Sequence, residues 1–138
     1  STFDIRIPVD TNCKITEQKI STLVNEIAHR RKVEAYYSII DETEPFEAPH
    51  DSPIVRAFTL GVMDVEHTRP TLIRKTGTGD MNVIGNQWKI PVVTYGPGDP
   101  HQAHTIDEKV SIDEYLRGIE ILKKTIHHLK RLHDKNME

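Results

Sequence analysis

The chain opens with alternating apolar and polar positions. Every second residue is apolar over the first stretch, which is the period of a strand buried on one side: Phe3, Ile5 and Ile7. A predicted helix begins at Thr16, and its apolar residues return at helical spacing: Ile20, Leu23, Val24 and Ile27. Residues 33–40 are rich in β-branched and aromatic side chains and predict a second strand. Residues 1–44 are therefore expected to form a strand–helix–strand unit, which needs further strands to close a sheet.

A second helix is expected after a proline-containing connection. Residues 44–51 hold two prolines and several acidic side chains, as is typical of a link between two parts of a protein. Ser52 and Pro53 then predict a helix start, with a capping side chain followed by Pro in the first helical position. The apolar face of this helix consists of Ile54, Val55, Phe58, Val62 and Val65.

The rest of the chain combines short predicted strands with one long helix. Residues 70–73 and 90–94 have the length and apolar character of short strands, and residues 81–87 predict one or two helical turns. A capping box at Ser111 and Glu114 starts the final helix, expected from about residue 111 to about residue 131. Its apolar face contains Ile112, Tyr115, Leu116, Ile119, Leu122, Ile126 and Leu129. Together these elements predict an α/β fold.

Composition and charge exclude several classes of function. The 138 residues are 36% hydrophobic and 28% charged, as in ordinary globular proteins. The net charge of −3 offers no basic field for nucleic acid, and the basic run at residues 29–32 complements the end of the first predicted helix. No stretch has the length of a membrane span. The single cysteine, Cys13, excludes an internal disulfide and fits the cytoplasm, and no base is evident that would make it catalytic.

The first candidate binding loop is the run Thr76, Gly77, Thr78, Gly79 and Asp80. Closely spaced glycines let backbone N–H groups approach a ligand, and the hydroxyls can add hydrogen bonds. Asp80 could cap the helix that follows. Such a loop suits a carboxylate or another anion, although a structural turn has the same composition. It is not a phosphate loop, because no Gly-Lys-Ser/Thr run is present.

The second candidate loop spans residues 95–108 and contains His101 and His104 between turn-forming Gly and Pro residues. Imidazole is a common metal ligand, and rigid turns can hold it at a fixed angle. Asp107 and Glu108 could support a metal-bound imidazole or cap the next helix. Either histidine could instead be a solvated surface residue. No spacing in the chain suggests a third and a fourth ligand.

Three blocks of the chain resemble, in order and spacing, the acetylornithine deacetylase and succinyl-diaminopimelate desuccinylase family of dizinc amidohydrolases. Phe-Asp-Ile-Arg at residues 3–6 is similar to a strand midway through the family's lid, or dimerisation, domain. Gly-Thr-Gly-Asp at residues 77–80 resembles its Gly-Thr-Ser-Asp loop, with Gly79 in place of Ser. Gly-Pro-Gly at residues 96–98, followed by Ala-His-Thr-Ile-Asp-Glu at 103–108, resembles its closing block, which a long helix follows.

The run at residues 75–82 is most similar to the lysine-biosynthesis branch, whose members release lysine or ornithine from an amino-group carrier protein. Met81 and Asn82 stand where arginine-pathway deacetylases tend to have an Arg after the Asp. A guanidinium at that place is therefore not expected to bind the substrate carboxylate in this chain.

The resemblance implies a fold, a site and a mechanism. Residues 1–48 would form the second half of a ferredoxin-like lid, and residues 49–138 the C-terminal strand–loop–helix part of a zinc-peptidase-like catalytic domain. Two zinc ions, or cobalt, would polarise an amide carbonyl and supply hydroxide while a Glu acts as general base. His104 would be a metal ligand, and Gly77 and Thr78 would contact the substrate's carboxylate end. The lid would form a homodimer.

The family's remaining metal ligands are not found in this chain. It contains neither the His-x-Asp motif nor the adjacent Glu-Glu pair that the family places upstream of the lid. It also starts at Ser1, already in a strand-like pattern. We therefore expect part of a longer amide hydrolase acting on an acylated basic amino acid, with no catalytic residue in this part and no activity on its own. The alternative is a non-enzymatic small-molecule-binding or dimerisation module with a ferredoxin-like half-domain.

Overall fold

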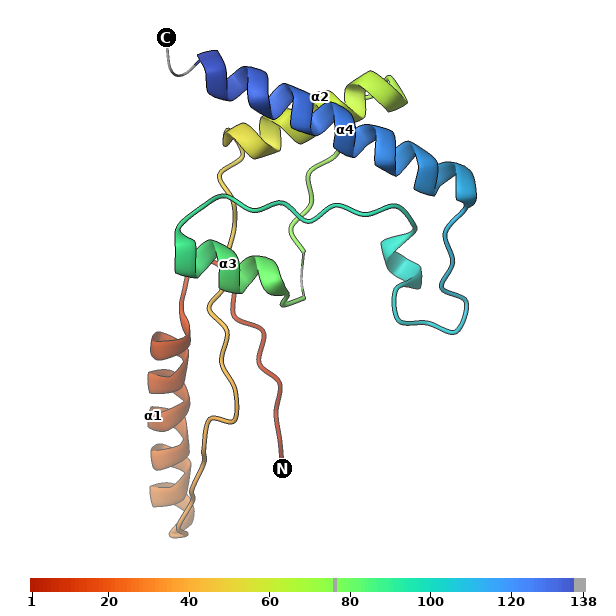
Figure 1. Cartoon of the computed structure of the whole chain (residues 1–138). Helices are drawn as coiled ribbons and strands as arrows, with labels where there is room; N and C mark the ends of the chain where they lie inside the picture. Colours follow the sequence, from red (N-terminus) through yellow and green to blue (C-terminus); the bar gives the residue numbers. More distant parts are fainter. Residues whose placement is uncertain (76, 136–138) are drawn as a thin grey trace. The chain divides into compact units, whose positions relative to one another are not determined.

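The computed structural model describes residues 1–75 and 77–135, which form four α-helices and one 3₁₀ helix (Figure 1). The helices are α1 (Cys13–Arg31), α2 (Pro53–Glu66), α3 (Asp80–Trp88) and α4 (Ile112–Lys135), with the short helix η1 (Pro100–Gln102) before α4. All four α-helices lie where the hydrophobic pattern predicts helix. Within the described residues, no helix is long and apolar enough to cross a membrane.

The predicted α/β fold is wrong for the described part of the chain, which contains helices and no strand. Residues 1–7, 33–40, 70–73 and 90–94 run without the ladder of backbone hydrogen bonds that defines a sheet. A strand is stable only when a neighbour supplies those bonds, whereas side-chain alternation indicates only which residues share a face. The ferredoxin-like half-lid, the strand–loop–helix part and the ferredoxin-like alternative module are wrong for the same reason.

The chain divides into two compact units. Unit 1 combines Ser1–Glu47 with Arg74–Ile90 and holds α1 and α3. Unit 2 combines Ala48–Ile73 with Pro91–Glu138 and holds α2, η1 and α4. Each unit is therefore built from segments that are separated in the sequence.

In unit 1, α1 begins three residues before the predicted start at Thr16. Asn12 is its N-cap and accepts a hydrogen bond from the Ile15 N–H at 2.8 Å. The Thr16 hydroxyl bonds back to the Asn12 carbonyl within the first turn, so Thr16 belongs to the helix. The last turn is basic, as predicted, and Lys32 ends the helix in the left-handed conformation with a φ of 53°.

The second helix of unit 1 is attached to the connection at residues 44–46. Asn82 and Asn86 each donate a side-chain hydrogen bond to the Glu44 carbonyl at 3.1 Å. The Phe46 ring covers Gly85, so closely that a methyl group on Gly85 would collide with it. Helices α1 and α3 make no helix–helix contact with each other in the described residues. Side-chain amides and one aromatic ring therefore hold α3 in place.

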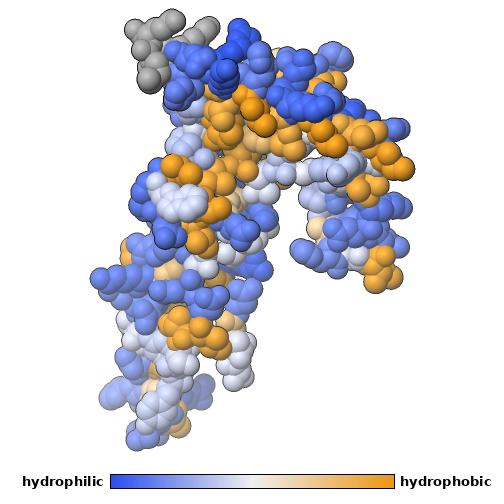
Figure 2. Space-filling view, in the orientation of Figure 1, coloured by the Kyte–Doolittle hydropathy of each residue, from blue (hydrophilic) through white to orange (hydrophobic). Residues whose placement is uncertain are grey.

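In unit 2, α2 and α4 pack against each other, and hydrophobic residues gather along them (Figures 1 and 2). The buried residues of this pair are Val55, Ala57, Gly61, Gly118, Ile121 and Thr125. Gly61 lies at the closest approach, since a Cβ atom built on it would be 2.5 Å from the Thr125 hydroxyl oxygen and 3.0 Å from the Ile121 carbonyl oxygen. The outer edge of the interface carries an ion pair of Arg117 with Glu66 and a hydrogen bond between His128 and Asp64.

The helix starts of unit 2 differ from the predicted caps. Ser52 is the N-cap residue of α2, but among the described residues its side chain makes no capping hydrogen bond and its buried Oγ finds no hydrogen-bond partner. At α4, the Ser111 hydroxyl accepts from the Glu114 N–H at 3.0 Å, which is one half of the predicted capping box. The Glu114 carboxylate instead accepts from the Gly98 N–H at 2.8 Å, so it holds the preceding loop. Helix α4 also runs to Lys135, beyond the predicted end.

Candidate functional site

The first candidate loop belongs to unit 1 and precedes α3. Thr76 lies outside the described residues, while Gly77 is half-buried and Thr78 is exposed. Gly79 is the N-cap of α3, and its N–H donates to the Asn82 side chain at 3.2 Å. Asp80 is thus the first helical residue and not the predicted cap, although its charge still complements the positive end of the helix.

Cationic side chains surround the glycines of this loop. A Cβ atom built on Gly79 would lie 3.2 Å from the Lys75 ammonium nitrogen, and one built on Gly77 would lie 3.9 Å from a guanidinium nitrogen of Arg6. Arg6 also pairs with Asp4 at 3.2 Å. Positive charge beside a helix N-terminus is an environment that suits an anion.

The second candidate loop belongs to unit 2 and is held by carboxylates that accept backbone hydrogen bonds. Asp99 accepts from the His101 N–H at 2.9 Å at the start of η1. Glu114 holds the Gly98 N–H, where the backbone has a φ of +100°. Glu108 accepts from the His104 N–H at 2.8 Å. The loop conformation therefore depends on three acidic side chains from within and beyond it.

His104 is exposed, and its backbone adopts the left-handed conformation with a φ of 64°. Among the residues that the structure describes, no side chain is bonded to its imidazole ring, so both ring nitrogens are available to a ligand. His101 lies in the same loop and is also exposed. The two residues of the first loop, Gly77 and Thr78, belong to the other unit.

The residues of this chain do not by themselves fit a catalytic metal centre. Over residues 1–75 and 77–135, no group of three or more His, Cys, Asp or Glu side chains is placed to hold an ion. A catalytic zinc normally takes three protein ligands, and the exposed His104 imidazole fits one of them. Any metal site that includes His104 would need ligands from elsewhere.

Cys13 is the first residue of α1 and is buried, three residues before the predicted helix start at Thr16. Burial raises the pKa of the Cys13 thiol, and the negative charges of Glu44 and Glu42 raise this pKa further. A thiol with a raised pKa is a poor nucleophile at neutral pH. The structure thus offers no catalytic environment for this cysteine.

Three contributions to the two loops were missed by the sequence analysis. Lys75 lies beside Gly79, Glu114 holds Gly98, and Tyr95 packs against Phe58 with ring centroids 5.4 Å apart. Burial raises the pKa of the Tyr95 hydroxyl, and the nearby Glu66 and Glu114 raise this pKa further. The spacing of Ser111 and Glu114 identified an acidic residue at the helix start, but it could not show that the carboxylate turns toward the loop.

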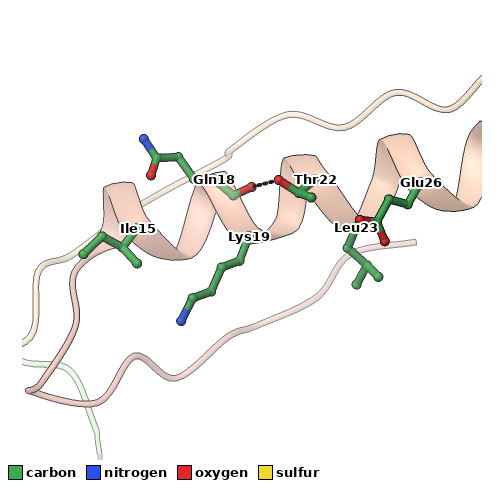
Figure 3. A pocket seen from close by; sticks show the side chains of 6 residues that line it. All are labelled: Ile15, Gln18, Lys19, Thr22, Leu23 and Glu26. Atoms are coloured by element: carbon green, nitrogen blue, oxygen red, sulfur yellow. Dashed lines mark hydrogen bonds between the residues drawn. The ribbon is translucent and has the colours of Figure 1, made fainter.

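A hollow of about 430 Å³ on the surface of unit 1 is not part of either candidate loop. It is lined from α1 alone, by Ile15, Gln18, Lys19, Thr22, Leu23 and Glu26 (Figure 3). Figure 3 shows these side chains along one side of the helix, with the Thr22 hydroxyl bonded to the Gln18 carbonyl at 2.9 Å. Ligand sites usually enclose most of their ligand, which the side of one helix cannot do.

Comparison with known proteins identifies relatives along most of the chain. Over 127 residues, 92% of the chain, it is 32% identical to a LysW-lysine/LysW-ornithine hydrolase of Saccharolobus islandicus. Over 94 residues, 68% of the chain, it is 40% identical to a protein of Thermococcus kodakarensis with the same name, given provisionally, and 39% identical to one of Pyrococcus horikoshii. The matched parts cover 34%, 27% and 29% of these relatives, so the chain spans about a third of their length or less.

The model of peptidase family M20/M25/M40 matches residues 6–128. This range includes both candidate loops and most of α4. Proteins of this family are generally metal-dependent, and the resemblance found in the three sequence blocks is confirmed. The chain belongs to peptidase family M20/M25/M40.

Proposed function

We propose that this chain is part of a metal-dependent amide hydrolase that releases lysine or ornithine from an amino-group carrier protein. Family membership over residues 6–128 supports the reaction class. The names of the relatives support the substrate, since they are called LysW-lysine/LysW-ornithine hydrolases. Because the chain spans 34% or less of their length, the remaining parts of the active site come from residues outside it.

In this proposal His104 is one metal ligand, and Gly77 and Thr78 contact the carboxylate end of the substrate. The metal site holds two zinc ions, which cobalt can replace. The observation that carries the role of His104 is its exposed imidazole, which has no partner in the described residues and extends from a loop fixed through its backbone. The cationic surroundings of Gly77 and Gly79 support the carboxylate site.

The proposed domain division assigns residues 1–48 to a lid that forms a homodimer and residues 49–138 to the catalytic domain of a cytoplasmic enzyme. The boundaries of the two compact units differ from this domain division, because Arg74–Ile90 groups with the first 47 residues. The carboxylate-binding loop is therefore grouped with the lid segment in this chain, while the histidine loop belongs to the other unit.

The test is hydrolysis of a lysine-loaded carrier by the full-length protein that contains this chain. His104→Ala should lower turnover by orders of magnitude without unfolding the protein, because it removes a metal ligand. His101→Ala is the matched control, since it deletes another exposed imidazole from the same loop. Unchanged turnover in His104→Ala, or an equal loss in both variants, contradicts the assigned role.

Zinc titration of the chain alone tests the need for outside ligands. We expect weak zinc binding and no amidase activity, because one imidazole cannot hold a catalytic zinc. Tight stoichiometric binding with turnover would show that this chain holds a complete site.

A further inference from the structure

We propose that Glu108 is a positioning residue that fixes the backbone at His104 and so sets the direction of the imidazole. This inference rests on the proposed function only for its effect on metal binding. The observation behind the proposal is the hydrogen bond that the His104 N–H donates to the Glu108 carboxylate at 2.8 Å. From the sequence, either Asp107 or Glu108 could support the imidazole; in the structure Glu108 bonds the backbone N–H of His104 and not the ring.

The backbone at His104 needs such support. A φ of 64° is in the left-handed region, which costs a residue with a Cβ atom about 1 kcal/mol or more. A charge-assisted hydrogen bond to a carboxylate is stronger than a neutral one, and 2.8 Å is within its typical length. The Glu108 bond therefore offsets the cost of the conformation that it holds.

Two consecutive turns bring Glu108 back to His104. The Thr105 N–H and the Thr105 hydroxyl both donate to the Gln102 carbonyl, at 3.1 and 2.7 Å. The Glu108 N–H then donates to the Thr105 carbonyl at 3.2 Å. These bonds reverse the chain twice within residues 102–108, so the Glu108 carboxylate lies over the backbone N–H four residues earlier.

The bond acts on the backbone and leaves the ring available. A carboxylate bonded to a ring nitrogen would occupy one of the two possible ligand atoms, whereas the Glu108 bond uses neither. Gly98 of the same loop is held in a similar way. Its backbone is also left-handed, and its N–H donates to the Glu114 carboxylate at 2.8 Å. Both left-handed positions of this loop thus have a carboxylate on their N–H group.

Nuclear magnetic resonance of the whole chain tests the bond without metal or substrate. The intraresidue amide-to-Hα Overhauser effect of His104 is strong only when φ is positive. In Glu108→Ala this effect should weaken, and the His104 amide should exchange about tenfold faster with solvent, as expected for loss of one charged hydrogen bond. Glu108→Gln keeps an acceptor oxygen and should restore both signals. Asp107→Ala removes a neighbouring charge, has no bond to His104 in the described residues, and should leave them unchanged.

A signal that is the same in Glu108→Ala and in wild type would overturn the proposal, as would an equal change in Asp107→Ala. In the full-length hydrolase, Glu108→Ala should weaken metal binding about 10- to 100-fold, with partial recovery in Glu108→Gln. If the backbone signal changes but His104→Ala leaves turnover intact, the bond stands and the proposed function fails. If His104→Ala abolishes turnover and the backbone signal does not respond to Glu108, the proposed function stands and this inference fails.

Discussion

Helix α1 of unit 1 and helix α2 of unit 2 are stabilised in different ways. Helix α1 of unit 1 has a formed N-cap, a basic last turn and a single buried residue, Cys13. Helix α2 of unit 2 has a buried face against α4 but no side-chain capping bond at Ser52. Local signals therefore define α1, whereas packing defines α2. Most helical stability in proteins comes from packing an apolar face, so the helix with the better local signals is not the better buried one.

The largest expected difference between the units concerns their apolar side chains. Ile121 on α4 is 3% exposed, while Leu23 on α1 is 56% exposed. Ile121→Ala should lower the free energy of unfolding by about 2–5 kcal/mol, because it leaves a cavity between packed helices. Leu23→Ala, the matched control, should change it by less than about 0.5 kcal/mol. Urea denaturation followed by circular dichroism measures both, and equal losses would remove the distinction between the units.

The next effect tests the close approach of α2 and α4. Gly61→Ala places a methyl group against Thr125 and the Ile121 backbone, which should cost about 1–3 kcal/mol through overpacking. Gly118→Ala is the control, because its Cβ atom would lie 3.6 Å from the nearest atoms, in ordinary contact with Tyr95 and Pro97. That change should be neutral or stabilising, since Ala favours helix over Gly. Denaturation midpoints that fall equally in both variants would argue against a special role for Gly61.

A smaller effect compares the two N-caps. Asn12→Ala should destabilise the first turn of α1 by about 1 kcal/mol, because it removes the bond to the Ile15 N–H. Ser52→Ala should cost little or even stabilise α2, since it removes a buried hydroxyl that has no hydrogen-bond partner within residues 1–75 and 77–135. Amide hydrogen exchange in the first turn of each helix measures both changes. If Ser52→Ala speeds amide exchange in the first turn of α2 more than Asn12→Ala does in α1, then Ser52 and not Asn12 is the stabilising cap.

The smallest effect is a pH dependence confined to unit 2. The hydrogen bond from His128, at 2.9 Å, holds the pKa of the Asp64 carboxyl below its ordinary value, and the nearby Lys124 and His127 add to this. A lowered folded-state pKa means that the carboxylate contributes stability above its ordinary pKa of about 4 and loses it as the pH falls through the folded value. Asp64→Asn should therefore be less stable than wild type at neutral pH and equal to it in strong acid.

The control for this pH dependence is the same substitution in a His128→Ala background, where Asp64→Asn should have little effect at any pH. Denaturation series at several pH values provide the measurement. A difference between wild type and Asp64→Asn that grows in acid would have the wrong sign for the proposed pair.

The hydrophobic pattern by itself determined the positions of the helices, because apolar residues at helical spacing and start signals such as Ser52-Pro53 act over a few residues. The family was determined by three short motif blocks, whose order and spacing can be recognised in the sequence without any structure. The predicted strands failed because a strand depends on a partner elsewhere, and alternation at Phe3, Ile5 and Ile7 contains no information about that partner.

Only the tertiary structure decided how the candidate loops are held. His104, Gly77 and Thr78 could be chosen from the sequence, and their proposed roles remain to be tested. The bond between Glu108 and the His104 N–H depends on the two turns at residues 102–108. The bond between Glu114 and the Gly98 N–H depends on where the first turn of α4 lies relative to the preceding loop. Side-chain type and spacing limit which bonds are possible, but several acceptors compete for each N–H group. The folded path of the backbone selects among them.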